Sequence, residues 1–534
     1  MNHTQDFAAT SSGKAIAASE DAASLLGGRG ALDCAMTASD NAMAVLPLPT
    51  SVPRLASIDA LYAPETLEVQ RRRYRKLRDG FFAHFSDRRG EPDGQAEPDE
   101  RGKPGWQAGP EPLFFSAPGR TELCGNHTDH NNGKVLAAAI SLDTIGAAAP
   151  RMDSLVRVVS EGFDSFEVDL ADLTVRRGEK GSSAAIVRGM AAGIAARSDA
   201  AARHDTAARR GAAQPYGTAR SYDESQPYDS SSRQRDGSRV SLRGFDAFIQ
   251  SDVLPGSGLS SSAAFEVLVG SMICVFSGIE VSPSEIAKIG QYAENEYFGK
   301  PCGLMDQMAC ALGNTAAIDF GDPSNAKVEL LRFDPSEYGL SLAIVATGGS
   351  HADLTDDYAA IPGEMRAVAA VLGRSTLAGT SLASLLAQAG EIRKSCGDRA
   401  FLRAWHFVKE TGRPAILQKA IQAKDIAAYL ATVKASGDSS AKYLQNLYAA
   451  KSPCEQGILV ALAVSEDFLA AEGACRVHGG GFAGTIQTYV PTIKLSAYKA
   501  LMESMFGPSS VFPLRIRPFG VVCIESKKGA FDER

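Results

Sequence analysis

A glycine- and serine-rich segment, LPGSGLSSSAAFEV at residues 254–267, has the residue types that can hold a phosphate group. Gly256 and Gly258 allow backbone N–H groups to converge on a ligand, and a helix that starts directly after them adds unpaired N–H groups and the positive end of its dipole. The hydroxyl groups of residues 260–262 can bind phosphate oxygens or a magnesium ion. The pattern predicts a polyphosphate site, with an ordinary turn as the alternative.

Two well-known nucleotide-binding patterns do not account for this segment. A Walker A loop needs GxxxxGK followed by Ser or Thr, and the nearest approach, NNGKV at 131–135, lacks the first glycine and the hydroxyl group. The HRD and DFG motifs of protein kinases do not occur together in the chain. A kinase built on this loop would therefore belong to another structural design.

A second segment, SAPGRTELCGNHTDHNNGK at 116–134, collects polar side chains that can donate and accept hydrogen bonds, among them Arg120, His127 and Asp129. They stand in a stretch rich in Gly and Asn between two apolar runs. Such a loop suits recognition of a polyhydroxylated substrate. A solvated loop with a helix cap is the alternative.

Two carboxylates, Glu294 and Asp306, lie in the segment 282–308. This segment begins with a capping box, in which Ser282 is the N-cap residue and Glu285 follows three positions later. The two carboxylates then stand near the two ends of one helix-turn unit. This placement suits a metal-binding carboxylate and a catalytic carboxylate, and two solvated acids are the alternative.

Helices, strands and a glycine turn must position these residues. Apolar residues between Phe265 and Phe276 fall on one face, so we expect a helix over 259–277 that ends at Gly278, preceded by a strand within 244–253. A triple glycine at 479–481 connects two strand-like runs. It permits close approach to a ligand or a neighbouring loop, and a tight hairpin connection is the alternative.

The rest of the chain divides into patterned and unpatterned parts. Residues 1–55 are rich in Ala, Ser, Gly and Thr, and we expect them to be a disordered extension. Residues 56–112 read as a helical segment, with an apolar stripe at 58–85, followed by a linker. A low-complexity insertion occupies 196–238. Further periodic runs predict a helix at 455–471 and strands at 341–347 and 510–524.

The composition of the 534 residues excludes several classes of protein. A hydrophobic fraction of 44% with 22% charged residues is typical of globular proteins, and the net charge of −7 argues against nucleic-acid binding. The sequence contains no run of 18 apolar residues and no recognisable secretory signal, so we expect no membrane association and a cytoplasmic location. Nine cysteines without CxxC and eight histidines without HExxH predict neither a disulfide framework nor a zinc site.

Together and in this order, the four segments resemble the signature set of the galactokinases within the GHMP superfamily of small-molecule kinases. LPGSGLSSSAA and GGGFAG resemble motifs shared across the superfamily, whereas APGRTELCGNHTDHNNG and PCGLMDQ resemble the galactokinase branch. The resemblance spans about residues 113–525. It implies an α+β fold of two domains, ribosomal-protein-S5-like at 113–345 and ferredoxin-like at 346–534, with the active site in the cleft between them.

The resemblance also implies an activity: ATP-dependent phosphorylation of the anomeric hydroxyl of galactose, which yields galactose 1-phosphate and ADP, with Mg²⁺ as cofactor. Asp306 matches the catalytic aspartate, and Arg120 matches the partner that keeps it ionised, since a nearby cation lowers a carboxyl pKa. Asp306 either removes the hydroxyl proton early or mainly stabilises the developing charge. Its contribution to the rate should be of order a hundred- to ten-thousandfold.

The remaining roles follow from the same match, position by position. The sugar-facing positions are Asn126, His127, Asp129, Gly303 and Tyr358, the last of which closes over the sugar. The phosphate loop consists of Gly256, Ser257, Gly258, Leu259, Ser260, Ser261 and Ser262. The magnesium ligands are Ser262 and Glu294, and residues 479–481 form the turn that packs beside the phosphate loop.

Three residues depart from the family pattern near the sugar. Where GEHTDY is common, this chain has GNHTDH, so Asn126 replaces a glutamate expected near the primary hydroxyl and His130 replaces a tyrosine. Glu122 stands where asparagine is usual. Galactose remains the leading substrate, and another hexose, a uronic acid or an amino sugar is the alternative. A non-catalytic sugar sensor on the same scaffold is a third hypothesis.

Overall fold

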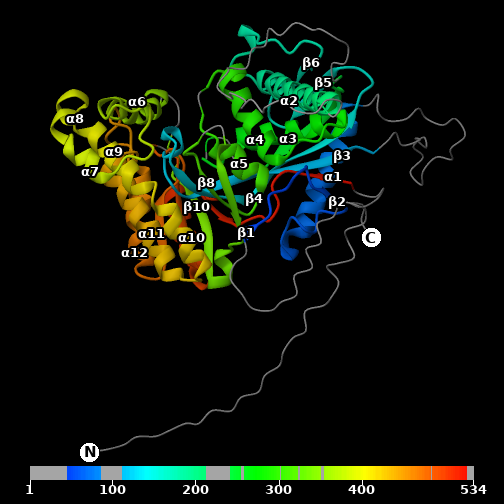
Figure 1. Ribbon diagram of the computed structural model, residues 1–534. Coiled ribbons are helices and arrows are strands. Elements are labelled where there is room, and N and C mark those ends of the chain that lie inside the picture. The colour runs from blue at the N-terminus through cyan, green and yellow to red at the C-terminus, as the bar shows by residue number, and fades with distance from the viewer. Residues whose placement is uncertain are drawn as a thin grey trace, which may run out of the picture. The chain divides into compact units, whose positions relative to one another are not determined.

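The computed structural model describes residues 45–85, 111–211, 241–253, 256, 258–300, 302–322, 325–349, 354–482 and 484–525, without the side chains of 199–211 and 355 (Figure 1). These residues form helices and two β-sheets, which confirms the expected α+β class. In this part of the chain, no helix combines the length and the apolar character needed to cross a bilayer.

The larger sheet carries the segment that contains Arg120. Its long central hairpin pairs β3 (Leu113–Cys124) with β4 (Lys134–Pro150) in antiparallel register. Within the described residues, its strand order is β1-β9-β8-β4-β3-β14-β2, and β7 joins β5 and β6 to β4. The other strands are β1 (Val45–Leu46), β2 (Arg54–Leu55), β5 (Leu155–Ser160), β6 (Phe166–Asp169), β7 (Phe245–Ser251), β8 (Thr315–Asp319), β9 (Lys327–Leu331) and β14 (Val522–Ile524).

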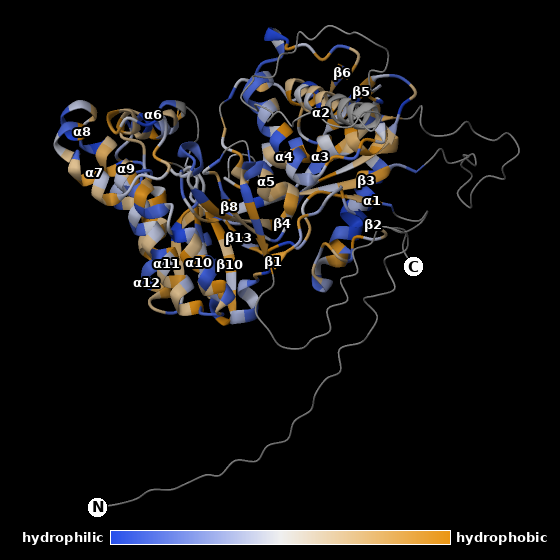
Figure 2. Ribbon diagram, viewed as in Figure 1, coloured by the Kyte–Doolittle hydropathy of each residue, from blue (hydrophilic) through white to orange (hydrophobic). Residues whose placement is uncertain are grey.

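Helices cover both faces of this sheet. Successive side chains of a strand point to opposite faces, so Phe114 and Phe115 of β3 belong to different cores. Phe114 packs in a core with α1 (Leu67–His84). Phe115 packs in the main core with α2 (Ser183–Gly211), α3 (Ser261–Ser277), α4 (Pro283–Tyr292) and α5 (Met305–Leu312). The strands of the sheet are coloured largely as apolar in Figure 2, as burial on both faces requires.

The smaller sheet carries the triple-glycine turn. Its order is β11-β12-β10-β13, all antiparallel, and the turn connects β11 (Ala474–Val477) to β12 (Thr485–Pro491). The other two strands are β10 (Leu340–Ala346) and β13 (Val511–Leu514). The helices of this half are α6 (Thr355–Val371), α7 (Leu382–Ala387), α8 (Ala389–Cys396), α9 (Asp398–Glu410), α10 (Arg413–Gln422), α11 (Ile426–Ser439), α12 (Gly457–Leu469) and α13 (Leu495–Phe506).

Several local predictions are confirmed. Helix α4 begins with the capping box, in which the Ser282 side chain accepts from the Glu285 backbone N–H and the Glu285 side chain accepts from Ser282. Gly278 ends α3 with φ 66°, a left-handed conformation that suits glycine. The predicted strand before α3 is β7, and the predicted helix at 455–471 is α12.

Other boundaries differ from expectation. Residues 45–46 and 54–55, placed by sequence in the disordered extension, pair with β9 and β14, because edge pairing uses backbone groups that need no apolar pattern. Helix α2 continues to Gly211, into the expected insertion. Residues 1–44, 86–110 and 212–240, which hold most of the expected extension, linker and insertion, lie outside the described residues.

The strand expected at 510–524 is two strands that belong to different sheets. β13 pairs with β10 in the smaller sheet, whereas β14 pairs with β3 in the larger one. Pro518 and Gly520 stand between them, and both residue types interrupt strands. The predicted domain boundary after residue 345 falls within β10. Because β14 returns to the larger sheet after the strands of the smaller one, no single cut of the described chain separates the two sheets. The domain limits stay predictions.

Candidate active site

The predicted phosphate loop lies between β7 and α3. Gly256 and Gly258 each have φ 73°, and Ser260, directly before the helix, has φ 63°. These left-handed conformations are inexpensive for glycine and uncommon for serine, so the surroundings must hold Ser260 in place. Ser257 lies outside the described residues. The loop ends at the N-terminus of a 17-residue helix, where backbone N–H groups are free to bind an anion.

Arg120 and Asp306 form a bidentate ion pair. Arg120 is in β3 and Asp306 is in the first turn of α5, 186 residues later. The Arg120 Nε donates to Asp306 Oδ1 at 2.8 Å, and Nη2 donates to Oδ2 at 2.9 Å. The Arg120 side chain is buried, whereas about a third of the Asp306 side chain is exposed, 6% against 34%. The carboxylate is therefore fixed by the arginine and still open to a substrate.

The pKa of Asp306 is lowered from its ordinary value. Burial by itself would raise this pKa, but the charge of Arg120 and the hydrogen bonds from Arg120 and Ser260 outweigh burial. The same pairing raises the pKa of Arg120, against the effect of its burial. Asp306 is therefore an ionised carboxylate at neutral pH.

The phosphate loop is joined directly to this pair. Ser260 Oγ donates to Asp306 Oδ2 at 2.5 Å, and the Arg120 guanidinium also donates to the Gly258 carbonyl oxygen. The Arg120 backbone N–H donates to the Leu259 carbonyl oxygen at 3.0 Å. The carboxylate and the loop thus belong to one site.

The predicted sugar-facing residues Gly303, Asp129 and His127 each make a close contact within the protein. Gly303 lies so close to Asp129 that a Cβ added at 303 would overlap the Asp129 carboxylate, so a larger residue there would displace that carboxylate. The Asp129 Oδ1 accepts from the backbone N–H of His130 at 2.9 Å, which orients the carboxylate. The His127 ring pairs with the Gly480 carbonyl oxygen at 3.0 Å, and burial, with His130, lowers its pKa to about 3. His127 is therefore a neutral hydrogen-bonding group.

The triple-glycine turn contacts both the loop that contains His127 and the predicted phosphate loop. Gly479 packs on Gly258, since a Cβ added at 479 would lie 3.4 Å from the Gly258 Cα. The Tyr358 hydroxyl of α6 donates to the Gly481 carbonyl oxygen at 2.9 Å, and the Tyr358 ring lies against Gly480. The predicted packing of this turn beside the phosphate loop agrees with these contacts.

The Asn126 side chain forms four hydrogen bonds within the protein. Its side chain is fully buried and donates to the Gly479 carbonyl oxygen at 2.8 Å and to Glu122 Oε2 at 3.3 Å. Its Oδ1 accepts from Asn446 at 3.0 Å and from Ser440 at 3.2 Å. All four hydrogen-bonding positions of the amide are thus used within the protein. The contact between Asn126 and the sugar that the sequence predicts stays a prediction.

The two predicted magnesium ligands stand on separate elements. Ser262 is exposed in the first turn of α3, and Glu294 is buried in the π-helical segment η6 (Ala293–Phe298). Gln307 Nε2 donates to Glu294 Oε2 and to Glu266 Oε2, at 3.0 Å each. The other carboxylate oxygen of Glu266 is buried without a hydrogen-bond partner. Serine hydroxyl and carboxylate oxygens are ligand types that a hard cation such as Mg²⁺ takes.

Sequence reasoning missed two residues of this site, Glu266 and His478. Glu266 has a raised pKa because of burial and of the neighbouring Glu294 charge. His478 pairs with Thr121 of β3 at 3.1 Å, directly before the glycine turn. Glu266 lies four residues after Ser262 and thus on the same helix face, which was an available signal. His478 is adjacent to the glycine motif, but nothing local indicates its partner.

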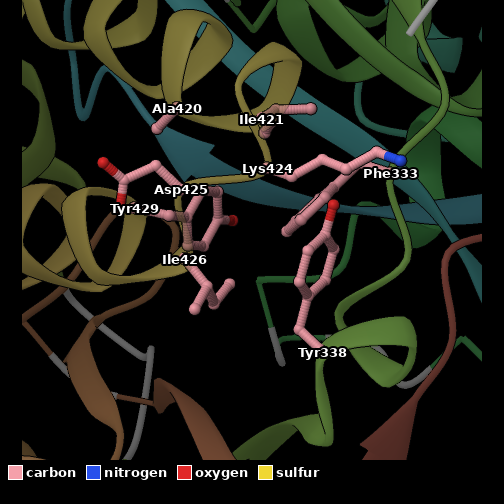
Figure 3. Close-up of a pocket in the computed structure, with 8 residues that line it drawn as sticks. All are labelled: Phe333, Tyr338, Ala420, Ile421, Lys424, Asp425, Ile426 and Tyr429. Atoms are coloured by element: carbon pink, nitrogen blue, oxygen red, sulfur yellow. The ribbon is translucent and has the colours of Figure 1, made fainter. Parts of the chain in front are cut away.

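A separate hollow lies outside the site, between α10, α11 and the short helix η8 (Pro335–Tyr338) (Figure 3). The Phe333 and Tyr429 rings meet there with centroids 4.7 Å apart. None of its lining residues belongs to the sugar, phosphate or magnesium positions. They are Phe333, Tyr338, Ala420, Ile421, Lys424, Asp425, Ile426 and Tyr429.

Two segments of the chain that contain residues of this site match models of known protein families. Residues 230–314 match the model of the GHMP kinases N terminal domain, and residues 107–150 match the galactokinase galactose-binding signature. These ranges include the phosphate loop and α5 in the first case, and Arg120 to Asp129 in the second.

Whole-chain similarities extend further. The chain is 31% identical over 396 residues to a galactokinase of Chloroflexus aurantiacus, covering 72% of this chain and 86% of that protein. It is 29% identical over 392 residues to a galactokinase of Actinobacillus pleuropneumoniae serotype 3, covering 73% and 88%. The solved structure of Lactococcus lactis galactokinase complexed with galactose has the same fold, with a TM-score of 0.59 at 24% identity, covering 77% and 94%.

Proposed function

The chain belongs to the galactokinase family, and on this premise we propose that it transfers the terminal phosphoryl group of ATP to the anomeric hydroxyl of galactose. The products are galactose 1-phosphate and ADP. One observation carries the proposal: an ionised, arginine-held carboxylate, Asp306, is hydrogen-bonded to the phosphate loop through Ser260. In the proposal, this carboxylate acts as the catalytic group beside the reacting phosphate.

Each group then has a role in the transfer. His127, Asp129 and Tyr358 bind the sugar hydroxyls, and the loop at 256–262 with the α3 N-terminus binds the ATP phosphates. Asp306 orients the anomeric hydroxyl and accepts its proton as the new O–P bond forms and the bond to ADP breaks. Its lowered pKa makes it a weak base, so we place proton transfer late, as a loose phosphoryl-transfer transition state allows.

Magnesium is part of the proposal. Ser262 and Glu294, with Glu266 near Glu294, would hold the ion. Arg120 is paired with Asp306. When bound, Mg²⁺ would supply positive charge that neutralises the phosphate groups during transfer. Because ATP is the co-substrate, we also place the protein in the cytoplasm.

The substrate is tested by ADP release with ATP, Mg²⁺ and a panel of free sugars: galactose, glucose, galacturonic acid and galactosamine. We expect galactose to give the highest kcat/KM. Turnover of another sugar without turnover of galactose would support the kinase activity and reject galactose as the substrate. A protein that binds galactose but releases no ADP with any sugar would be the non-catalytic sensor.

A further inference from the structure

The turn at 125–127 must be held in an unfavourable backbone conformation. Gly125 has φ 102° and His127 has φ 58°, and a left-handed conformation is uncommon for a residue other than glycine. His127 and, two residues later, Asp129 are the side chains proposed to bind the sugar. Their positions therefore depend on whatever fixes the peptide groups of this turn.

Glu410, at the end of α9, holds one of these peptide groups. Its Oε1 accepts from the Gly125 backbone N–H at 3.0 Å and from Ser436 Oγ of α11 at 2.6 Å. Arg413 donates to its other carboxylate oxygen. The Glu410 side chain is fully buried, and its partners neutralise its charge within the protein.

His406 holds the next peptide group. Its Nε2 pairs with the Asn126 carbonyl oxygen at 2.9 Å, and its Nδ1 pairs with Ser439 Oγ at 2.9 Å. A carbonyl oxygen only accepts, so Nε2 carries the proton. Burial lowers the pKa of His406, which leaves Nδ1 of the neutral ring to accept from the serine hydroxyl.

His406 and Glu410 are four residues apart, so they lie one above the other on the same face of α9. That face contacts the two consecutive residues Gly125 and Asn126 of the turn after β3. We propose that these two side chains are positioning residues: they hold the turn from α9, and through it the sugar-binding groups. The proposal rests on the sugar kinase function above.

The test separates sugar binding from nucleotide binding. In His406→Leu the Asn126 carbonyl loses its donor, so we expect the sugar KM to rise by about tenfold, the scale of a lost buried hydrogen bond, with the ATP KM unchanged. In His406→Gln the amide nitrogen replaces Nε2 as donor, so we expect the sugar KM to stay within about threefold of wild type.

A matched control accounts for loss of stability. Leu385→Ala in α7 removes a fully buried side chain from the core against which α9 packs, without touching the turn. We expect it to lower the melting temperature and leave both KM values unchanged. If His406→Leu does not fold, Ser439→Ala removes the Nδ1 partner with a smaller loss of volume, and the sugar KM should still rise.

The assays use the panel sugar that wild type turns over best. The test of the positioning role therefore also applies if the substrate is a sugar other than galactose. The positioning role would be overturned if the sugar KM were unchanged in His406→Leu, or in Ser439→Ala where His406→Leu is unfolded. That result would leave the proposed kinase activity unaffected. Equal rises in the sugar and ATP KM values would also overturn the positioning role. Wild type inactive with every sugar would overturn both proposals.

Discussion

Asp306 receives three hydrogen bonds, two from Arg120 and one from Ser260. Two of these donors are in one guanidinium, whose planar fork matches a carboxylate and fixes its orientation. The third comes from the phosphate loop. At the scale of single residues, orientation and charge of Asp306 therefore depend on the same contacts, and the loop that would hold ATP also orients the carboxylate.

Asp306→Asn tests the charge with little change of shape. The amide oxygen can still accept one hydrogen bond from Arg120, but the NH2 group faces the other donor and the amide cannot accept a proton, so we expect kcat to fall by about a hundred- to ten-thousandfold. ATP binding should remain, because the loop backbone is unaltered. An ADP-release assay and a nucleotide titration measure the two quantities. Full turnover in this variant would reject the catalytic role of Asp306.

At the scale of elements, the glycine turn between β11 and β12 packs against two other segments. Gly479 touches the phosphate loop at Gly258, and Gly480 touches the Tyr358 ring of α6. These contacts are possible because the backbone approaches without side chains in between. The turn therefore connects the loop proposed to bind ATP with Tyr358, which is proposed to bind the sugar.

Gly480→Ala tests this close contact. A Cβ at 480 would overlap the Tyr358 ring, and Gly480 has no left-handed φ, so the effect is purely steric. We expect a loss of about 1 to 3 kcal/mol in unfolding free energy and a raised sugar KM, since Tyr358 must move. Urea unfolding and sugar saturation curves measure both.

The matched control is Gly363→Ala in α6, where nothing lies within 4 Å of an added Cβ. We expect this control to be neutral or stabilising by about 0.5 to 1 kcal/mol, because alanine favours helices. If both variants behave alike, the contact between Gly480 and Tyr358 has no role in sugar binding.

At the scale of the molecule, buried charged side chains join the larger sheet and the turn after β3 to the smaller sheet and its helices. Glu122 of β3 pairs with Arg476 of β11 at 2.7 Å, and both side chains are almost fully buried. Glu410 of α9 accepts from the Gly125 backbone N–H after β3. Since a buried charge without its partner is costly, these contacts specify how the two halves fit together.

Glu410 makes the stability of the folded state dependent on pH. Burial would raise its pKa, but His406, Arg413, Arg476 and Ser436 lower it to about 2, against 4.5 for an ordinary glutamate. The folded state therefore gains stability from this carboxylate above pH 4.5 and loses it as the pH falls from 4.5 toward 2. The shift corresponds to about 3 kcal/mol.

We expect Glu410→Gln to be less stable than wild type at pH 7, with the difference shrinking as the pH falls toward 3. Urea unfolding of both proteins at pH 7, 5, 4 and 3 measures it. A difference that is the same at every pH would show that the charge of Glu410 is not what stabilises this contact.

Local features of the fold and much of the candidate site could be predicted from the sequence. The capping box of α4, the Gly278 stop of α3 and the turn at 479–481 depend on residues within a few positions of one another. The family motifs indicated Arg120 and Asp306, and the structure brings them together. The pairing of residues 45–46 and 54–55 was missed, because backbone hydrogen bonds at a sheet edge leave no pattern in side chains.

The sequence by itself determined the chemistry available to this protein: an arginine and a carboxylate, a loop able to hold phosphate, and the helices and turns that carry them. Only the tertiary structure decided which groups meet. Ser260 reaches Asp306 across 46 residues, and His406 reaches the Asn126 carbonyl across 280. The Asn126 side chain likewise forms hydrogen bonds to Gly479, Ser440 and Asn446, each more than 300 residues away in the sequence. Contacts over such separations depend on how sheets and helices pack, and no local periodicity encodes them.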